Sequence, residues 1–536
     1  MKNIPLSFVL LLLITIAYAQ IHLEAEDGQL NGTVVQNSIQ GFSGSGYVTG
    51  FDVDDDEVVL TVPISTSGSF KMTIGYRATS YKEQSIYVNG LSGGKIILPQ
   101  TSGFEEVEVG GVYLPEGSNT ISIRKDWGYF DFDYLLLTPT PPHDYNIQSD
   151  LIDIDADSKT VALWEYLKDQ FGNKVITGQT NYYDELTSVS GKRPKQRAFD
   201  FQTYTNGYPY KWENGTGHVF GWEDQGRTEE IIEWYNDTEG CGIVSIQWHW
   251  HSPSGGSAGT NTFRTNQTTF DVTKAINTSE PEYDLIIEDI DSIATQLKKL
   301  QTAGVPVLWR PLHEAGGGWF WWGAKTPEAC LELWDIMYDR LTNFHNLHNL
   351  IWVWSTPETE WYPGNDKVDV FGYDSYPGAY IYSVQKSVFD HMYELSNGEK
   401  VLAMTENGPI PDVDQMIEQD AMWVYFSSWD DLVVQQNTNS HIQSTFVHPS
   451  AINLDDHPCG VVSTAHAVLK NDLGSPYPNP FGEFLRLSKS TGWTLFNCQG
   501  EQLVQGNGDS ISTAELPQGI YLMQFANGHT FKLIKE

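Results

Sequence analysis

The sequence predicts a multidomain chain with an N-terminal all-β sandwich, a central (β/α)8 TIM barrel and a small C-terminal all-β module. Three observations support this prediction. At 536 residues, the chain is too long for one hydrophobic core. Near residue 140 the pattern changes from short alternating runs to apolar runs separated by helical stretches. Near residue 474 the short alternating runs return.

Residues 1–19 have the pattern of a secretory signal peptide. Lys2 gives a charged start, Phe8 to Ile16 form an apolar stretch, and Ala17-Tyr18-Ala19 match a small-residue cleavage site. An uncleaved anchor is the alternative, but the apolar stretch is short for crossing a bilayer. We therefore expect export followed by cleavage.

Residues 20–140 contain short runs in which apolar and polar residues alternate, among them VVLTVPI, FKMTIGY and NTISIR. Gly, Ser, Pro and Asn separate these runs, as between the strands of an all-β sandwich. The segment TPTPP (138–142) then predicts a short, stiff linker.

Residues 145–460 predict the barrel. The candidate strands are 174–178, 197–201, 242–248, 305–309, 350–355, 368–374, 401–405 and 423–429. Helical patterns such as 283–304 and 327–345 lie between them, and eight strands alternating with helices are typical of a (β/α)8 barrel. A doubly wound open sheet is the alternative, because the second and eighth runs are weak. Residues 474–536 are too few for a large core and predict a compact β-module.

Composition excludes several kinds of partner. The net charge of −38 argues against nucleic acid and anionic membranes, and suits a secreted protein that acts on a neutral polymer. The four cysteines (Cys241, Cys330, Cys459 and Cys498) form no CxxC pair, which argues against a zinc or redox site. One disulfide is expected, and the sequence leaves its pairing open.

Glu314 and Glu406 are the candidate catalytic carboxylates. Glu314 lies in WRPLHEAGGGWFWWG (309–323), directly after one predicted strand, and Glu406 directly follows another. The C-terminal ends of barrel strands meet at one mouth, and two carboxylates there are the minimum for cutting a glycosidic bond. The aromatic run 319–322 follows three glycines and suits the wall of a sugar-binding cleft better than a core.

These motifs resemble glycoside hydrolase family 26 over residues 145–460. The resemblance rests on TGQ (177–179), WHW (248–250), His313–Glu314, NLIWVWS (349–355), YPGNDKVDVFGYDSY (362–376) and TENG (405–408), in family order. It implies an endo-acting, retaining β-1,4-mannanase that hydrolyses mannan and galactomannan without a cofactor. Glu314 would be the acid/base, kept protonated by an apolar surround, and Glu406 the ionised nucleophile.

The resemblance also implies seven substrate-binding side chains: His249, Arg310, His313, Trp319, Asp374, Tyr376 and Trp429. Tyr376 would hydrogen-bond the nucleophile, while Arg310 and Asp374 would organise the same floor. Trp319 and Trp429 would stack on sugar rings. His251 is the alternative to His249, and a core role is the alternative for Trp429.

The N-terminal domain resembles a family 35 carbohydrate-binding module, with family 6 as the alternative. The opening HLEAEDG, GFSGSGYV (41–48) and the closing Asp133–Tyr134 carry this resemblance. It implies a structural calcium ion held by Glu24, Glu26 and Asp133, since the two glutamates share a strand face by the period of two. Trp127 is the candidate stacking residue.

The C-terminal module resembles a type IX secretion sorting domain, on YPNPF (477–481) and GIYLM with KLIKE near the end. This implies periplasmic passage through the type IX machinery, then release or attachment at the cell surface. A small sugar-binding domain is the alternative. For the whole chain we expect a monomer. The alternative functions are a β-1,3-xylanase, a mixed-linkage glucanase and an inactive surface glycan-binding protein.

Overall fold

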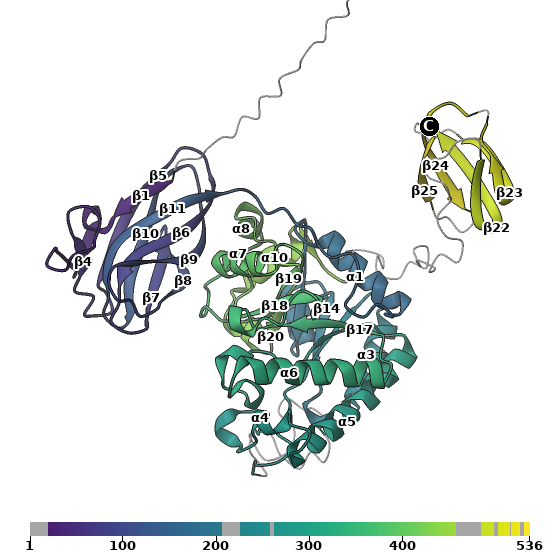
Figure 1. The fold of residues 1–536 in the computed structure, drawn as a ribbon, viewed down its shortest axis with the longest axis horizontal. Coiled ribbons are helices and arrows are strands. Elements are labelled where there is room, and N and C mark those ends of the chain that lie inside the picture. Colours follow the sequence, from purple (N-terminus) through teal and green to yellow (C-terminus); the bar gives the residue numbers. More distant parts are fainter. Residues whose placement is uncertain are drawn as a thin grey trace, which may run out of the picture.

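The computed structural model describes residues 20–205, 226–257, 262–456, 484–497, 502–514, 516–525 and 530–535 (Figure 1). The predicted signal peptide (1–19) and the YPNPF motif lie outside these residues. Three folded parts follow one another along the chain, and they are the sandwich, barrel and β-module that the sequence predicts.

The N-terminal part is a sandwich of two antiparallel sheets. One sheet has the order β3-β4-β11-β6-β9, with β1 also paired to β11, and the other has the order β2-β5-β10-β7-β8. The strands are β1 (Ile21–Glu24), β2 (Gln29–Asn31), β3 (Val34–Gln36), β4 (Tyr47–Thr49), β5 (Glu57–Ile64), β6 (Gly68–Arg77), β7 (Lys82–Val88), β8 (Leu91–Leu98), β9 (Glu105–Leu114), β10 (Gly117–Trp127) and β11 (Asp131–Thr140).

Strict alternation explains how this sandwich forms its core. On β5, Val58, Leu60 and Val62 are buried, whereas Thr61 and Pro63 between and beyond them are exposed. Successive side chains of a strand point to opposite faces, so each strand of this kind supplies one apolar face to the space between the sheets.

The central part is a closed barrel of eight parallel strands. These are β13 (Gly178–Thr180), β14 (Gln196–Asp200), β15 (Ile243–Gln247), β16 (Val307–Arg310), β17 (Leu350–Trp354), β18 (Val370–Ser375), β19 (Val401–Asn407) and β20 (Phe426–Trp429). Because β13 pairs with β20, the sheet has no edge, and the alternative of an open doubly wound sheet is wrong.

The first predicted barrel strand (174–178) differs from the structure. The segment divides into β12 (Val175–Ile176), which pairs with β21 (Ala451–Ile452) outside the barrel, and β13, which closes it. Both β12 and β13 are fully buried, so the burial pattern does not change between them. The sequence therefore gives no indication of where one strand ends and the next begins.

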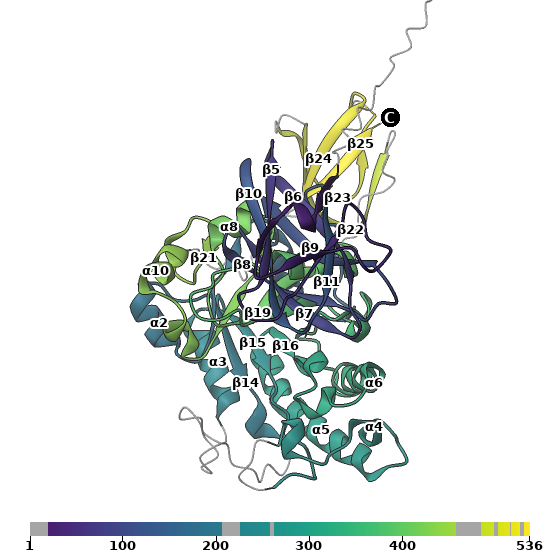
Figure 2. The same cartoon turned by 90° about the vertical axis from the view of Figure 1, so that its left-hand side faces the viewer.

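Helices stand outside the barrel strands, as Figure 2 shows for α3, α5 and α6. They are α1 (Ser158–Gln170), α2 (Tyr183–Ser190), α3 (Arg227–Asp237), α4 (Val272–Ala275), α5 (Pro281–Ala303), α6 (Pro327–Tyr338), α7 (Lys386–Leu395), α8 (Val413–Glu418), α9 (Leu432–Gln435) and α10 (Asn439–Val447). The longest, α5, begins with Pro281 and ends at Gly304 in the left-handed conformation. In the part of the chain that the structure describes, no helix is long and apolar enough to cross a membrane.

The C-terminal part is a four-stranded antiparallel sheet with the order β23-β22-β24-β25. Its strands are β22 (Phe484–Asn497), β23 (Gln502–Ser512), β24 (Gly519–Phe525) and β25 (Thr530–Lys535). A small core that includes Leu495, Met523 and Leu533 holds it together. Of the four cysteines, Cys241 is disulfide-bonded and Cys330 is a buried free thiol, while Cys459 and Cys498 lie outside the described residues.

The sandwich docks on the barrel through β9 and α7 (Figure 1). Two glycines of β9 make the approach close. A Cβ atom on Gly110 would lie 2.5 Å from Cβ of Ser387, and one on Gly111 would overlap the carboxylate of Asp390. The backbone of β9 therefore lies directly against the side chains of Ser387 and Asp390 on α7, with no space for a side chain on either glycine.

Charged groups surround this docking site. His143, directly after Pro142, lies 3.0 Å from Asp390 and 3.1 Å from Asp420. Burial lowers the pKa of His143, but the two carboxylates outweigh burial and the net shift is upward. On the sandwich, Lys71 forms an ion pair of 2.9 Å with Glu394 of α7. Polar contacts thus fix the orientation of the two domains.

We predict that Gly111→Val separates the sandwich from α7. Valine is favoured in strands, so the substitution should leave strand β9 intact. Its effect would come from steric overlap between the valine side chain and Asp390. Small-angle X-ray scattering of the full chain should show a larger radius of gyration. Gly68→Val, at a strand position with nothing within 4 Å of the added Cβ, is the matched control. A scattering curve like that of the unchanged protein would contradict close docking through Gly111.

Candidate active site

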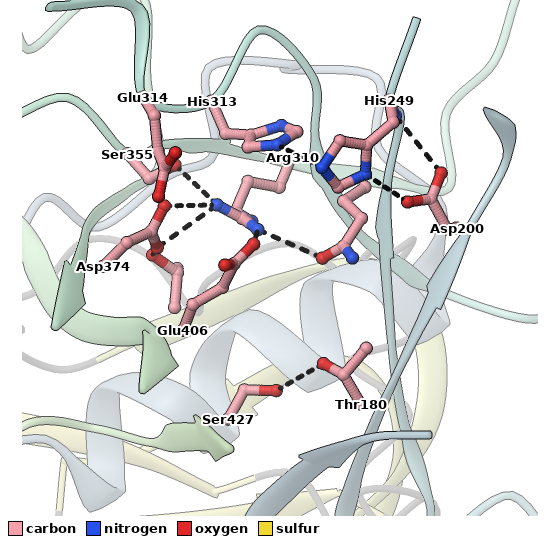
Figure 3. Close-up of polar contacts among 12 residues, drawn as sticks. Thr180, Asp200, His249, Arg310, His313, Glu314, Ser355, Asp374, Glu406 and Ser427 are labelled. Atoms are coloured by element: carbon pink, nitrogen blue, oxygen red, sulfur yellow. Dashed lines mark hydrogen bonds and ion pairs between the residues drawn. The ribbon is translucent and has the colours of Figure 1, made fainter. Parts of the chain in front are cut away.

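Polar side chains gather at the mouth of the barrel, where the strands end (Figure 3). The strands place them there because parallel strands end at the same face of a barrel. The sequence-predicted residues in this group are His249, Arg310, His313, Glu314, Trp319, Asp374, Tyr376, Glu406 and Trp429.

The turn after β16 places Glu314 in this group. Leu312 and Glu314 both have left-handed backbones, with φ of 50° and 53°. Non-glycine residues adopt this conformation at some cost, and they keep it only where the surroundings hold them there. Here the N–H of Glu314 donates to the carbonyl of Ser355 at 3.1 Å, and the N–H of Ala315 donates to Oγ1 of Thr356 at 2.9 Å. The end of β17 therefore holds the turn.

The glycines that follow allow Trp319 to fold back over the same turn. A Cβ atom on Gly317 would overlap the indole ring of Trp319, and one on Gly323 would overlap the carbonyl of Ala315. The Nε1–H of Trp319 donates to Oε2 of Glu314 at 2.8 Å, while the side chain stays 49% exposed. Trp319 thus both contacts Glu314 and offers an open aromatic surface.

The other aromatics of this run differ from the prediction that they line a cleft. Phe320, Trp321 and Trp322 are buried and belong to the core. The Nε1–H of Trp322 donates to the carbonyl of His313 at 2.9 Å, which fixes the backbone beside Glu314. The composition of the run did not show which single ring faces solvent.

Arg310 is the central cation of the site. It is 1% exposed, and its guanidinium donates to Ser355 at 2.9 Å, to Asp374 at 2.9 Å, to Gln247 at 3.0 Å and to Oε1 of Glu406. A buried guanidinium needs such partners, because an unpaired charge is strongly unfavourable in the interior. The predicted pairing of Arg310 with Asp374 at the base of the site is therefore present, and Arg310 also binds Glu406.

Glu406 lies within β19 and receives a second donor. The hydroxyl of Tyr376, whose side chain is 43% exposed, donates to Oε2 at 2.6 Å. Burial raises the pKa of Glu406, and Arg310 and Tyr376 oppose this shift by stabilising the charged form. Both donors that the sequence predicted are thus in place.

Glu314 has a different environment. Burial, and then the charge of Glu406, raise its pKa, while the neutral indole of Trp319 opposes the shift. Burial also raises the pKa of Asp374 to about 7 despite Arg310. Oxygen atoms of Glu314, Asp374 and Glu406 lie within 4.8 Å of one another. Crowded carboxylates of this kind favour one protonated and one ionised member.

His249 and His313 form the opposite wall of the site. Their Nε2 atoms are 3.3 Å apart, and Nδ1 of His249 contacts the buried Asp200 at the end of β14. His251, the alternative to His249, is fully buried behind them and its Nδ1 contacts Thr262 at 2.9 Å. Sequence reasoning missed Asp200, although an aspartate at the end of the second predicted strand was a usable signal.

Trp429 ends β20 and lies near this wall. Its ring centroid is 5.8 Å from that of His249, and the side chain is only partly buried. Trp429 has the position expected of a second stacking surface, and its role in substrate binding stays a prediction.

In the sandwich, Glu24, Glu26 and Asp133 surround the loop 43–46. Ser43 donates through its N–H to Asp133 at 3.0 Å and through its hydroxyl to Glu24 at 2.6 Å, and the N–H of Ser45 donates to Glu26 at 2.6 Å. Burial, followed by the charges of Glu24 and Glu26, raises the pKa of Asp133 to about 6. Within the described residues, the buried Oε2 of Glu26 has no hydrogen-bond partner. Glu24 ends β1, whereas Glu26 lies in the 3-10 helix Ala25–Asp27, so the expectation that the two glutamates share a strand face is wrong. Calcium binding by these three carboxylates stays a prediction.

Trp127, the predicted stacking residue of the sandwich, is 56% exposed at the end of β10. The ring of Tyr81 lies 5.8 Å away, and Nζ of Lys82 lies 5.3 Å above the indole. Tyr129, two residues on, is also exposed. Trp127 is thus part of an open aromatic surface, of which sequence reasoning missed Tyr81 and Tyr129.

Comparison with known families agrees with two of the three resemblances, and the type IX sorting domain stays a prediction. Residues 152–456 match the model of Glycosyl hydrolase family 26, and residues 21–140 match that of Carbohydrate binding module (family 35). The alternative of a family 6 module is therefore wrong.

Individual relatives match over most of their length. A mannan endo-1,4-beta-mannosidase of Thermothelomyces thermophilus is 36% identical over 81% of this chain and 89% of that protein. Mannan endo-1,4-beta-mannosidase B of Piromyces sp is 33% identical over 82% of this chain and 77% of that protein. The crystal structure of the Podospora anserina GH26-CBM35 beta-(1,4)-mannanase has a TM-score of 0.57 at 34% identity, and covers 83% of this chain and 99% of that one.

We predict that Tyr376→Phe raises the pKa of Glu406 further. The lost hydrogen bond favours the charged carboxylate, so its removal favours the protonated form. Carboxyl ¹³C NMR over a pH titration would measure the shift. Tyr380→Phe is the matched control, since Tyr380 lies on the same loop and is exposed. A pKa of Glu406 that is equal in the two variants would show that the Tyr376 hydroxyl does not stabilise the carboxylate.

Proposed function

Because the chain belongs to glycosyl hydrolase family 26, we propose that it is a secreted, retaining endo-β-1,4-mannanase that hydrolyses mannan and galactomannan by double displacement. The observation that carries the proposal is the pair Glu314 and Glu406, whose carboxyl oxygens lie within 4.8 Å of one another. Retaining enzymes need a separation of about 5 Å, whereas inverting enzymes need about 6.5–9.5 Å to admit a water.

In the first step, Glu314 donates its proton to the glycosidic oxygen while Glu406 attacks the anomeric carbon. The bond to the leaving sugar breaks and a covalent glycosyl-enzyme forms. Burial and the charge of Glu406 favour the protonated form of Glu314 that this step requires. Arg310 and Tyr376 hold the attacking carboxylate in place.

In the second step, Glu314 is ionised and takes a proton from water, which attacks the anomeric carbon and releases Glu406. Loss of the negative charge on Glu406 in the intermediate lowers the pKa of Glu314, because the repulsion that raised it is gone. The same carboxyl group can therefore act first as acid and then as base.

The walls of the site suit a neutral hexose chain. His249 and His313 offer hydrogen bonds to sugar hydroxyls, and Trp319 and Trp429 offer aromatic surfaces. The relatives that are 36% and 33% identical are named mannan endo-1,4-beta-mannosidases, which favours mannan over β-1,3-xylan or mixed-linkage glucan. A binding protein without activity is disfavoured because the complete carboxylate, arginine and tyrosine arrangement is present.

We also propose that the family 35 module binds carbohydrate at Trp127 and holds calcium with Glu24, Glu26 and Asp133. Export is supported by the pattern of residues 1–19 and by the disulfide at Cys241, since disulfides persist in oxidising compartments. The C-terminal motifs support type IX secretion, and we further propose that the enzyme is a monomer.

We predict that the protein releases manno-oligosaccharides from linear mannan and galactomannan, and none from β-1,3-xylan or mixed-linkage glucan. Glu406→Gln should lower kcat by at least about 10³-fold, because the nucleophile is lost. Product chromatography beside the unchanged protein would measure both. Products from another polymer alone would show that this polymer, and not mannan, is the substrate. The absence of products from every polymer would favour the alternative of an inactive glycan-binding protein. Ordinary turnover by Glu406→Gln would refute the mechanism.

We predict that Ca²⁺ raises the melting temperature of the sandwich and that EDTA lowers it. A ligand at 100 times its Kd stabilises a domain by about 2.7 kcal/mol. Calorimetry of the full chain with and without Ca²⁺ would show the shift, and Glu26→Gln should abolish it. Glu116→Gln, at an exposed glutamate of the same domain, is the control. Identical melting in Ca²⁺ and in EDTA would rule out the calcium site.

A further inference from the structure

Asp200 lies one layer behind the wall formed by His249 and His313. It is the last residue of β14, only 3% exposed, and pairs in register with Gln247 of β15. Its Oδ1 accepts from the N–H of Gln202 at 2.8 Å and from the N–H of His249 at 3.2 Å, and its Oδ2 contacts Nδ1 of His249. Both oxygens are therefore used to hold one segment of backbone and one imidazole ring (Figure 3).

The contact between the two imidazoles restricts their protons. Since Nε2 of His249 faces Nε2 of His313 at 3.3 Å, one nitrogen must donate and the other must accept. If His249 is an imidazolium, it donates to both Asp200 and His313. His313 must then carry its proton on Nδ1, which is buried and has no hydrogen-bond partner among the described residues.

We propose that Asp200 is a positioning residue that keeps His249 protonated and thereby fixes His313 as the Nδ1–H tautomer, a hydrogen-bond donor beside the acid/base Glu314. The inference rests on the proposed glycosidase function. This Nδ1–H has no acceptor among the described residues, and a sugar hydroxyl bound against His313 has the right chemistry to supply one. Asp200 itself touches no substrate, and it acts through His249.

The charged and titratable groups around His249 agree with this arrangement. Asp200 faces it from β14, Glu406 from β19, Arg310 and His313 from β16 and its turn, and His251 from its own segment. Burial lowers the pKa of His249, but Asp200 outweighs burial and the pKa is raised. The pKa of His313 is held well below its usual value by burial and then by Arg310 and His249, so this ring is neutral.

The sign of the pH effect follows. The donor tautomer of His313 exists only while His249 is protonated, so it is present below the raised pKa of His249 and is lost as pH rises through it. Removing the charge of Asp200 lowers the pKa of His249. In the Asp200→Asn variant, substrate affinity should therefore begin to fall at a lower pH than in the unchanged protein.

The test uses the full chain and two readouts. A long-range ¹H–¹⁵N spectrum of the unchanged protein should show His249 with both nitrogens protonated and His313 protonated at Nδ1. Asp200→Asn should lower the pKa of His249 by at least about one unit, that is, tenfold in proton affinity. It should also raise KM for manno-oligosaccharides more than tenfold, with a smaller change in kcat. This effect should be largest at the pH where His249 is protonated in the unchanged protein and neutral in the variant.

Asp153→Asn is the matched control, because Asp153 is a buried carboxylate that contacts Nδ1 of His348 at 2.9 Å, away from the site. It should cost stability without moving the pH profile. An Nε2–H tautomer of His313 in the unchanged protein, or an unmoved His249 titration in Asp200→Asn, would overturn the proposal. The spectrum of the unchanged protein keeps the test valid if Asp200→Asn fails to fold. It is also independent of activity, so absence of mannan hydrolysis would refute the function and leave this test standing.

Discussion

The buried guanidinium of Arg310 is the interaction on which the mouth of the barrel depends. It is almost fully excluded from water, and it satisfies its donors with Gln247, Ser355, Asp374 and Glu406. These partners come from β15, the end of β17, β18 and β19. One cation therefore ties the ends of several strands together, and its loss would leave two buried carboxylates without their counter-charge, typically a cost of about 3–5 kcal/mol.

The same interaction separates the roles of two similar carboxyl groups. Burial alone raises the pKa of both Glu314 and Glu406. Glu406 receives a charged donor and a phenol. Among the described residues, the side-chain donor to Glu314 is the neutral indole of Trp319, and Glu314 also faces the charge of Glu406. The two groups therefore differ in the donors that oppose the effect of burial, and the proposed roles of acid and nucleophile require such a difference.

Much of this arrangement could be predicted from sequence because it depends on local pattern. The eight apolar runs identified the barrel, and strand-end positions identified Glu314 and Glu406. What failed depended on three-dimensional context. The division of residues 174–178 follows from pairing with β21, and the burial of Phe320 to Trp322 follows from how the glycines turn the chain. The register shift between Tyr373 and Asp374, which sets Asp374 opposite Glu406, leaves no pattern in a single sequence.

Docking of the sandwich adds a constraint that bears on function. The helix that receives β9 is α7, and α7 follows β18, the strand that carries Asp374 and leads into Tyr376. The carbohydrate-binding module is thus mounted on the β/α unit that supplies Asp374 and Tyr376, which contact Arg310 and Glu406. A module joined by a flexible linker only raises the local concentration of polymer, whereas a module held by backbone contact at Gly110 and Gly111 also fixes the direction in which a bound chain can run. The predicted linker 138–142 is shorter than expected, because β11 continues to Thr140. Since His143 follows closely and is held between Asp390 and Asp420, the orientation is set by contacts and not by a linker. The two glycines therefore allow the backbone contact that holds the module against the barrel.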